Sequence, residues 1–367
     1  MLKKIAIFSL ILAAFSLYAE GEYEGKLQET VVTATGFSDN IENQIKNITV
    51  ITNQDIIDKG YNNVEEILRR APGVNFVNNN FGNITDIRGQ GPEKASGRVK
   101  ILVDGVPMNI LDLSHALVPI NTVAVEDIEK IEIINGGGSV LYGNGTAGGV
   151  VNIITKKGRK EGASGKAYYQ NSSYNTNKLG FSTGLNLNNK LTLDLGYENI
   201  NGRGYRENDK TSSEFLKGGL IYNITDNQSL KFKATRYNEE YRESSGITAA
   251  QLAQNRKQRG ETLTFGNVVR KEYSLEYNVK PAENFEISIL GYKQKMRREY
   301  DQKDSETDTD GLFQDRKTGA RLKGNYNYGS GNLVFGYEYT DNDMLRKALN
   351  SYTVNMGRRT VKAGSDT

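Results

Sequence analysis

Apolar and polar residues alternate with a period of two over the second half of the chain, and this pattern constrains the fold more than any other feature. It starts near Ser164 and is clearest in LTLDLGYE (191–198), YSLEYNVK (273–280) and LVFGYEY (333–339). Successive side chains of a β-strand point to opposite faces, so each segment predicts a strand with one apolar and one mostly polar face. Counting such segments gives about ten strands.

The connections between these strands alternate in length. Four turns are short: 188–189, 225–227, 281–284 and 328–331. Three connections on the other side are long and charged: 201–212, 239–268 and 297–315. The first connection on that side, 174–177, is short and departs from the rule. Short turns at one end and long loops at the other are typical of outer-membrane β-barrels. A secreted β-sandwich, whose strands alternate in the same way, is the alternative fold.

The first 19 residues have the pattern of a secretory signal peptide. Lys3 and Lys4 form a basic start, 5–17 is an uncharged apolar stretch, and cleavage is expected after Ala19. A buried N-terminal helix is the alternative. No later segment approaches the roughly 20 apolar residues of a membrane-spanning helix. The chain has no cysteine, which excludes disulfides, and a net charge of +3 does not suggest nucleic acid as a partner.

A glycine-rich segment, INGGGSVLYGNGTAGGVVNIITKK (134–157), raises the question of a nucleotide site. A phosphate-binding loop needs a lysine directly after its last glycine. Here no lysine lies between Gly149 and Lys156. The segment also leads into the β-branched run 150–155, which predicts a strand, whereas dinucleotide-binding glycines open a helix. The glycines therefore favour a tight turn in which backbones pass close together.

A small α/β domain is predicted between 41 and 157. Within 53–74, Asn63 can cap a short helix that the Pro72-Gly73 pair ends. The segments ITDIRG, VKILVDGVPMN and IEKIEII predict strands, and the Asp104-Gly105 pair between two apolar runs predicts a tight turn.

Five motifs in this region, taken in order, resemble the TonB-dependent outer-membrane receptors. They are ETVVTAT (29–35), LRRAPGV (68–74), IRG (87–89), VKILVDGVPMN (99–109) and VEDIEKIEIINGGGSVLYGNGTAGGVVNIITKKG (125–158). The resemblance runs nearly continuously from Glu29 to Gly158, and the rest of the chain matches only as generic barrel strands. The triple glycine in NGGGSVLYG resembles the ferric citrate branch of the family.

The resemblance implies a fold class: an N-terminal mixed α/β plug domain inside a transmembrane antiparallel β-barrel of about 22 strands. The expected division is a signal peptide (1–19), a periplasmic segment (20–40) with a TonB box (29–35), the plug (41–157) and a partial barrel (158–367). Of the 367 residues, 210 follow Lys157, which suffices for about ten strands. We therefore expect the N-terminal part of a longer protein, or a truncated product.

The resemblance also implies a site for TonB. A short, uncharged, β-branched strand can add to the sheet edge of a partner through its backbone. The expected contacts are Glu29, Thr30, Val31, Val32, Thr33, Ala34 and Thr35. A first plug strand without a partner is the alternative. Only the nine residues from Glu20 to Gln28 precede Glu29 after the expected cleavage site, which leaves no room for a signalling domain, so transport without transcriptional signalling is expected.

Ligand contacts are expected in three plug segments, 78–83, 90–98 and 107–115, and in the outer loops. The plug candidates are Asn80, Phe81, Arg88, Lys94, Arg98, Met108 and Asn109. The loop candidates are Arg203, Tyr205 and Arg206, with Arg236, Tyr237 and Arg242 as further members. Arginine and tyrosine suit an iron chelate with carboxylate or catecholate groups. The alternatives are a buried plug arginine paired with barrel carboxylates for Arg88, and solvated loop residues for the others.

No catalytic or metal site is predicted. The acidic segment ETDTDG (306–311) imitates a calcium loop, but Lys317 stands where a bidentate glutamate is required. His115 is the only histidine, so no multi-histidine site can form. We expect no enzyme activity and no cofactor, with iron carried only as part of the chelate.

The function expected from the resemblance is TonB-dependent import of a ferric chelate, a siderophore or a ferric citrate-like complex, across the outer membrane. The expected partners are TonB with the inner-membrane proton-driven complex, the chelate, outer-membrane lipid and the barrel assembly machinery. Cobalamin and haem receptors are alternatives within the family. A passive channel or adhesin barrel and a soluble secreted enzyme are alternatives outside it.

Overall fold

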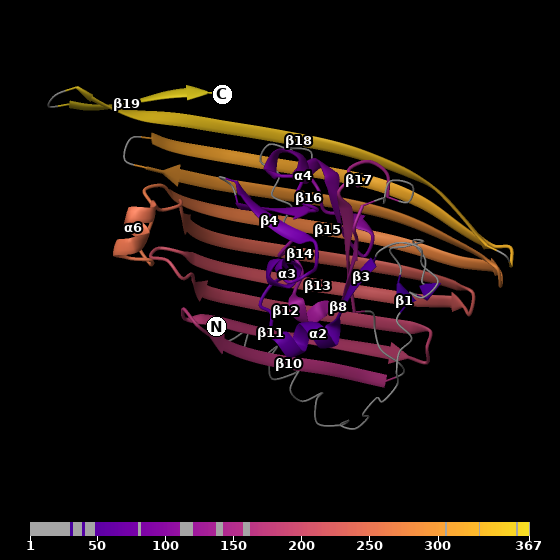
Figure 1. Cartoon of the computed structure of the whole chain (residues 1–367). Coiled ribbons are helices and arrows are strands. Elements are labelled where there is room, and N and C mark those ends of the chain that lie inside the picture. Colours follow the sequence, from indigo (N-terminus) through magenta and orange to yellow (C-terminus); the bar gives the residue numbers. More distant parts are fainter. Residues whose placement is uncertain are drawn as a thin grey trace.

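The computed structural model contains an N-terminal domain seated against one face of a large curved sheet (Figure 1). It describes residues 30–31, 39–40, 48–79, 82–110, 120–136, 142–156, 162–304, 307–329, 331–356 and 359–366. None of the helices in these ranges is long and apolar enough to cross a membrane.

A five-stranded mixed sheet forms the centre of the N-terminal domain. Its strands, in spatial order, are β3 (Ile48–Thr52), β8 (Ile128–Ile134), β9 (Gly149–Thr155), β6 (Val99–Val103) and β7 (Val106–Pro107). Only the β6–β9 pair is parallel. A separate hairpin pairs β4 (Val74–Asn79) with β5 (Gly82–Ile87). The strands predicted from ITDIRG, VKILVDGVPMN, IEKIEII and VVNIIT are all present.

Within its described residues, the domain has three α-helices: α2 (Asn53–Lys59), α3 (Val64–Arg69) and α4 (Pro92–Arg98). The sequence predicted one helix in 53–74, whereas the structure has two, because Gly60 adopts a left-handed conformation that ends α2. The predicted cap of α3 is confirmed, since the Asn63 side chain accepts a hydrogen bond from the Glu66 amide.

The larger of two buried apolar clusters joins most elements of the domain. Side chains that are almost wholly buried come from α2, α3, the β4–β5 hairpin and three strands of the central sheet, and they include Ile56, Ile67, Leu68, Ile101, Ile131 and Ile153. Gly149 lets β9 enter this core, because a Cβ at that position would lie 2.6 Å from the carbonyl oxygen of Ile134. The glycine segment therefore serves close backbone packing, as predicted.

The second half of the chain forms one antiparallel sheet whose neighbours follow each other in sequence. Within the described residues it has ten strands. These are β10 (Gly162–Ser172), β11 (Thr176–Leu187), β12 (Leu191–Arg203), β13 (Lys210–Thr225), β14 (Gln228–Ser244), β15 (Leu263–Ala282), β16 (Phe285–Lys303), β17 (Thr307–Asn327), β18 (Asn332–Met356) and β19 (Arg359–Asp366). A short helix, α6 (Ala249–Gln254), lies in the connection between β14 and β15.

The short turns lie where they were predicted, but one predicted loop is wrong. Residues 297–315 are mostly strand, because β16 and β17 continue to the pair Lys303–Asp308. The acidic segment 306–311 thus overlaps the start of β17 rather than a loop. Both faces of this stretch are polar, so it lacks the period-two hydropathy by which strands are recognised.

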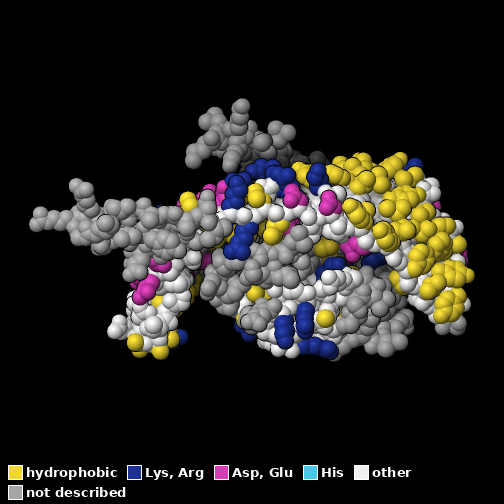
Figure 2. All heavy atoms as spheres, turned by 90° about the horizontal axis from the view of Figure 1, so that it is seen from above, with side chains coloured by type: hydrophobic (Ala, Val, Ile, Leu, Met, Phe, Trp, Pro, Cys, Tyr) yellow, Lys and Arg dark blue, Asp and Glu magenta, His cyan; other side chains and the backbone are white. Residues whose placement is uncertain are grey.

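The large sheet is apolar on its outer face and polar on the face toward the N-terminal domain. On β12, Leu195 is 55% exposed, whereas Glu198 on the opposite face is 5% exposed. Figure 2 shows the apolar side chains gathered over one part of the sheet. The exposed apolar side chains lie toward the short turns; examples are Leu193, Ile224, Leu275 and Leu333. This arrangement is the reverse of a soluble β-sandwich, in which apolar faces pack together, and it fits a lipid-facing belt.

Candidate functional site

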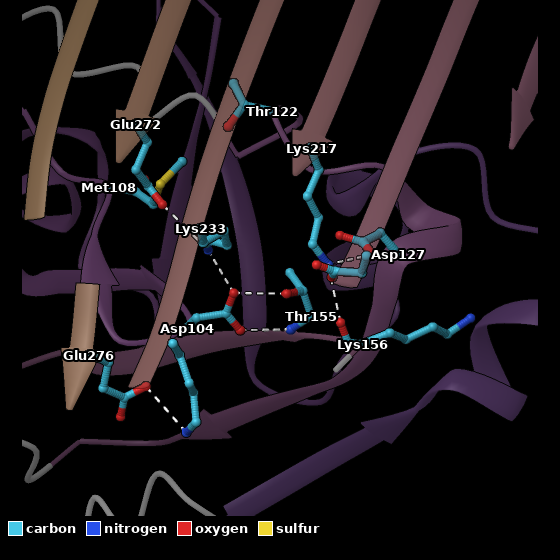
Figure 3. Close-up of polar contacts among 12 residues, drawn as sticks. Asp104, Met108, Thr122, Asp127, Thr155, Lys156, Lys217, Lys233, Glu272 and Glu276 are labelled. Atoms are coloured by element: carbon cyan, nitrogen blue, oxygen red, sulfur yellow. Dashed lines mark hydrogen bonds and ion pairs between the residues drawn. The ribbon is translucent and has the colours of Figure 1, made fainter. Parts of the chain in front are cut away.

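The turn between β6 and β7 carries a carboxylate that ties the N-terminal domain to the large sheet (Figure 3). Asp104 and Gly105 both have positive φ, 49° and 80°, which gives the tight turn that the sequence predicted. Asp104 accepts hydrogen bonds from the backbone amide and the hydroxyl of Thr155, each at 2.8 Å. Lys233 of β14 donates at 2.6 Å to Oδ2, the same oxygen that accepts from the Thr155 hydroxyl. Gly105 lies against Arg321 of β17, which donates to the Gly105 carbonyl at 2.8 Å.

A second carboxylate, Asp127, lies at the end of the short 3-10 helix Val125–Asp127. Lys217 of β13 donates to Asp127 at 2.9 Å and to the carbonyl of Lys156 at 3.1 Å. The same ammonium lies 3.1 Å from Asp194 of β12. One buried lysine of the sheet therefore binds two strand ends of the domain (Figure 3).

A third cluster is buried between β7 and the middle of the sheet. Arg270 and Glu272 of β15 pair with each other, and Arg270 also donates to the sulfur of Met108 at 2.8 Å. Lys233 lies 3.4 Å from Glu272, which connects this cluster to Asp104. Gln294 of β16 donates to the carbonyl of Pro107 at 3.0 Å.

The two aspartates of the domain have opposite pKa shifts. Burial pushes the pKa of Asp104 upward, but the Lys233 ammonium and the Thr155 amide outweigh it and hold the pKa at about 2. Burial dominates at Asp127 and raises its pKa to about 6, against the attraction of Lys217. The nearby carboxylates of Asp104 and Asp194 add to the rise, because their negative charges repel the ionised form of Asp127.

This interface is polar, in contrast to the core of the domain. The apolar clusters that bridge domain and sheet are small: Val106 with Leu290 and Tyr292, and Ala124 with Phe215 and Tyr237. Hydrogen bonds and ion pairs can be exchanged for contacts with water, whereas exposing an apolar core cannot be compensated in this way. The arrangement can therefore let the domain keep its own fold while its contacts with the sheet change.

Two of the expected ligand residues have structural contacts instead. Met108 is 2% exposed and lies in the core of the domain, against Arg270. The Asn109 side chain bonds the backbone of β6 twice, at the Ile101 amide and the Val99 carbonyl. These contacts give both side chains a structural role, and ligand binding by them stays a prediction. Tyr237 is likewise buried, against Ala124 and Phe215.

Other expected ligand residues are accessible. Arg88 is exposed, with a φ of 69°, and makes no ion pair within the described residues. Lys94 and Arg98 are exposed on α4, where Arg98 donates to Gln90 at 3.4 Å. Asn80, Phe81 and His115 lie outside the described residues.

The outer-loop candidates come together only in part. Tyr205 packs edge-on against Tyr174, with ring centroids 5.6 Å apart, and the Lys257 ammonium lies 5.9 Å from its ring. Arg206 donates to the carbonyls of Gln258 and Ser244, so it joins two loops rather than pointing freely outward. Arg203 is exposed at the end of β12.

The expected TonB-binding segment is described at two residues only. Thr30 and Val31 form β1 (Thr30–Val31), which pairs with β2 (Asp39–Asn40) in antiparallel register. Glu29 and Val32, Thr33, Ala34 and Thr35 lie outside the described residues. The backbone of this segment can thus pair as a strand, here with a neighbouring part of the same chain.

The sequence predicted no docking role for five residues that join the domain to the sheet: Asp104, Asp127, Lys217, Lys233 and Glu272. The only available signal was position: the three sheet residues fall on the polar face of strands whose other face is apolar. The alternation of apolar and polar residues identifies that face, but it does not predict which plug residue each side chain contacts.

The family model of the TonB-dependent receptor plug domain matches residues 40–150. This chain carries a TonB-dependent receptor plug. The N-terminal domain described above is accordingly called the plug, and the large sheet is the wall against which it is seated.

Similar proteins support the same assignment. The ferric enterobactin receptor of Pseudomonas aeruginosa is 28% identical over 364 residues, which cover 94% of this chain and 45% of that protein. The unliganded ferric citrate transporter FecA superposes with a TM-score of 0.72 at 22% identity, over 88% of this chain and 50% of that one. P. aeruginosa FpvA, bound to a ferric pyoverdine, superposes with a TM-score of 0.72 at 14% identity, over 90% of this chain and 46% of that one. The chain spans about half the length of the relatives it matches.

Proposed function

We propose that this chain belongs to a transporter that imports a ferric chelate across the outer membrane with energy delivered by TonB. The observation that carries the proposal is a plug domain held by polar contacts against a curved sheet whose outer face is apolar. The relatives named for ferric enterobactin and ferric citrate support iron chelates as the substrate class. The substrate would be a siderophore or a citrate-like complex, and its iron is cargo rather than a resident cofactor.

The mechanism requires no covalent chemistry. The chelate binds at exposed plug and loop residues, with Arg88, Lys94, Arg98, Arg203 and Tyr205 as accessible candidates. TonB pairs with the segment 29–35 through backbone hydrogen bonds. Its pull, driven by the inner-membrane proton gradient, separates some of the plug–wall contacts and opens a path inward. Outer-membrane lipid surrounds the apolar belt, and the barrel assembly machinery inserts the sheet.

The first test is uptake by cells that express the complete gene with Val32→Pro. Proline lacks the backbone N–H that a paired strand donates, so TonB should no longer engage. We expect energy-dependent uptake of a labelled ferric chelate to fall to the background of cells without the gene. Surface binding of the chelate at 4 °C should be unchanged. Val32→Ala, which keeps the N–H, is the matched control.

The outcomes separate the alternatives. Uptake that persists with the proline would overturn TonB coupling and favour a passive channel. Absence of iron uptake together with proline-sensitive uptake of cobalamin would keep the mechanism and replace the substrate. A panel of ferric citrate and several siderophores, offered one at a time, identifies the chelate.

A further inference from the structure

A cavity of about 650 Å³ lies between the plug and strands β17 and β18 of the wall. On the plug side, α4 and the glycine-rich stretch before β9 line it. On the wall side its lining follows β17 from Lys317 to Lys323, which is about 20 Å at roughly 3.3 Å per residue. The cavity is therefore elongated along the strand and large enough for a ligand of many atoms.

The lining of this cavity is strongly basic. Its cationic side chains are Lys100 of the plug and Lys317, Arg321 and Lys323 of β17. Against these four cations, the described lining contains one carboxylate, Glu338 of β18, which leaves an excess of three positive charges. Like charges gathered beside protein of low dielectric repel one another and attract anions from solution.

The contacts that these cations already make do not neutralise the excess positive charge. Lys317 donates to the carbonyl of Asn109, and Arg321 donates to that of Gly105 at 2.8 Å. Lys100 donates to the carbonyl of Tyr142 at 2.5 Å and lies 3.6 Å from Glu338. Carbonyl oxygens carry no net charge. Arg321 also retains most of its five N–H donors for a further partner.

Of the four cations, Lys323 has the fewest contacts that could offset its positive charge. The residue is only 8% exposed, and its ammonium lies 5.0 Å from the ring centroid of Tyr142. Within the part of the chain that the structure describes, no carboxylate forms an ion pair with it. Buried ammonium groups are normally paired, because desolvation of an isolated charge is costly. An anion in the cavity would supply the missing partner.

We propose that this cavity binds a multivalent oxyanion, one that carries carboxylate or phosphate groups, with Lys323 and Arg321 as its main contacts. The cavity runs from Lys317, in the middle of β17, to Lys323 near the short turn at 328–331. It borders the plug segments 90–98 and 107–115 and includes Asn109. The accessible candidates considered above do not line it: Arg88, Lys94, Arg98, Arg203 and Tyr205. The test below requires neither uptake nor TonB, so it can fail or succeed independently of the proposed function.

The chain has no cysteine, which allows a thiol reporter to be placed in the cavity. Val334 lines the cavity and alternates with the outward-facing Leu333 on β18. In outer-membrane vesicles containing the full-length protein, Val334→Cys is treated with an anionic or a cationic methanethiosulfonate of similar size. The same protein without the cysteine substitution gives the background rate.

If the cavity attracts anions, the anionic reagent should react roughly tenfold faster than the cationic one, after normalisation to a free thiol. Lys323→Gln should reduce this preference several-fold, and Lys323→Arg should retain it. Lys231→Gln is the matched control, because Lys231 is a lumen-facing lysine of β14 paired with Glu276 and lies outside this cavity. A ratio equal to that of a free thiol would overturn the proposal.

Binding is tested by protection of the same cysteine. Citrate and inorganic phosphate at millimolar concentration are added as separate probes before an uncharged thiol reagent. We expect at least one of them to slow labelling several-fold in Val334→Cys, and the effect to be lost with Lys323→Gln but kept with Lys231→Gln. Protection by citrate alone assigns the site to carboxylates, and protection by both assigns it to oxyanions in general. Absence of protection by either probe, or protection that survives Lys323→Gln, refutes the site.

Discussion

Asp104 is the residue on which the contact between plug and wall depends most. Its carboxylate accepts three hydrogen bonds, two from Thr155 within the plug and one from Lys233 of the wall. It therefore shapes its own turn and docks that turn at the same time. An asparagine at this position can accept at most some of these three hydrogen bonds. The Lys233 ammonium then has Glu272 as its remaining ion-pair partner.

We expect Asp104→Asn to weaken plug docking by about 2–4 kcal/mol, because one partner of a largely buried ion pair is removed. The measurement is the urea concentration at which the plug in the membrane-inserted protein becomes sensitive to protease. Asp58→Asn is the control, since Asp58 accepts one exposed hydrogen bond from Gln54, and it should cost less than about 0.5 kcal/mol. Equal midpoints for the two variants would contradict the role of Asp104.

Asp127 should make docking depend on pH in the opposite sense to Asp104. The pKa of Asp127 is raised from 3.8 to about 6, so the docked state binds a proton more tightly than the undocked state. Its contribution to stability is complete below pH 4 and is lost as the pH rises through 6. The pKa of Asp104 is lowered to about 2, so its contribution is complete above pH 4 and is lost as the pH falls through 2.

The pH profile of the protease-sensitivity midpoint tests this at Asp127. Between pH 4 and pH 6.5 the wild type should lose roughly 2–3 kcal/mol of docking free energy from this group. Asp127→Asn cannot titrate and should show a flatter profile over the same range. A wild-type profile that rises with pH, and does so equally in the variant, would show that Asp127 is ionised throughout.

Single residues could be predicted from the sequence where the cause is local. Asn63 was identified as a cap because its partner is three residues away, and Asp104-Gly105 as a turn because adjacent residues define it. The role of Asp104 in docking could not be predicted, since its partner Lys233 is 129 residues away. The structural contacts of Met108 and Asn109 could not be predicted for the same reason, because they depend on how the strands pack.

At the scale of elements, α2 is held by its first turn. Thr52 accepts a hydrogen bond from the Asp55 amide, and the Asp55 carboxylate accepts one from the Thr52 amide, which together form a capping box. The helix has only seven residues. So short a helix has little intrinsic stability, and the cap and the burial of Ile56 must maintain it.

Thr52→Ala should therefore destabilise the plug by about 1 kcal/mol, because the alanine leaves helix amides without an acceptor. Thr52→Ser keeps the hydroxyl and should restore most of the loss. Chemical denaturation of the plug, followed by circular dichroism, measures both variants against wild type. If Ser and Ala behave alike, the effect comes from the lost methyl group rather than from the cap.

The strands of the wall were predicted in number and order, but not in length. The sequence indicated about ten strands of membrane-spanning size, whereas β18 runs for 25 residues, more than twice the roughly 9–11 needed to cross a bilayer. On its outer face Leu333, Phe335, Tyr337 and Tyr339 give way to Asp341 and Asp343. Beyond the apolar belt a strand can be polar on both faces, and it then resembles a loop in sequence.

At the scale of the whole molecule, the outer face of the wall changes from apolar to polar along each strand, and substitutions should locate that boundary. Leu195→Arg places a charge in the apolar belt and should cost about 2–4 kcal/mol. Asn201→Arg lies on the same face of β12 six residues nearer the loop, where a charge should cost less than about 1 kcal/mol. Folding yield into lipid vesicles and urea stability measure both. Similar losses for the two variants would mean that the belt extends to the end of the strand.

The distances along the chain between docking partners have a consequence for the order in which this protein folds. The plug core joins residues within one continuous stretch of about a hundred residues, whereas Asp127 meets Lys217 across 90 residues, and Gly105 meets Arg321 across 216. Closing such long segments is slow compared with local folding. The plug can thus reach its native structure before its partners on β13 and β17 are in place. Its entry into the wall becomes a late, separate kinetic step, and the polar interface is what keeps an early-folded plug soluble until then.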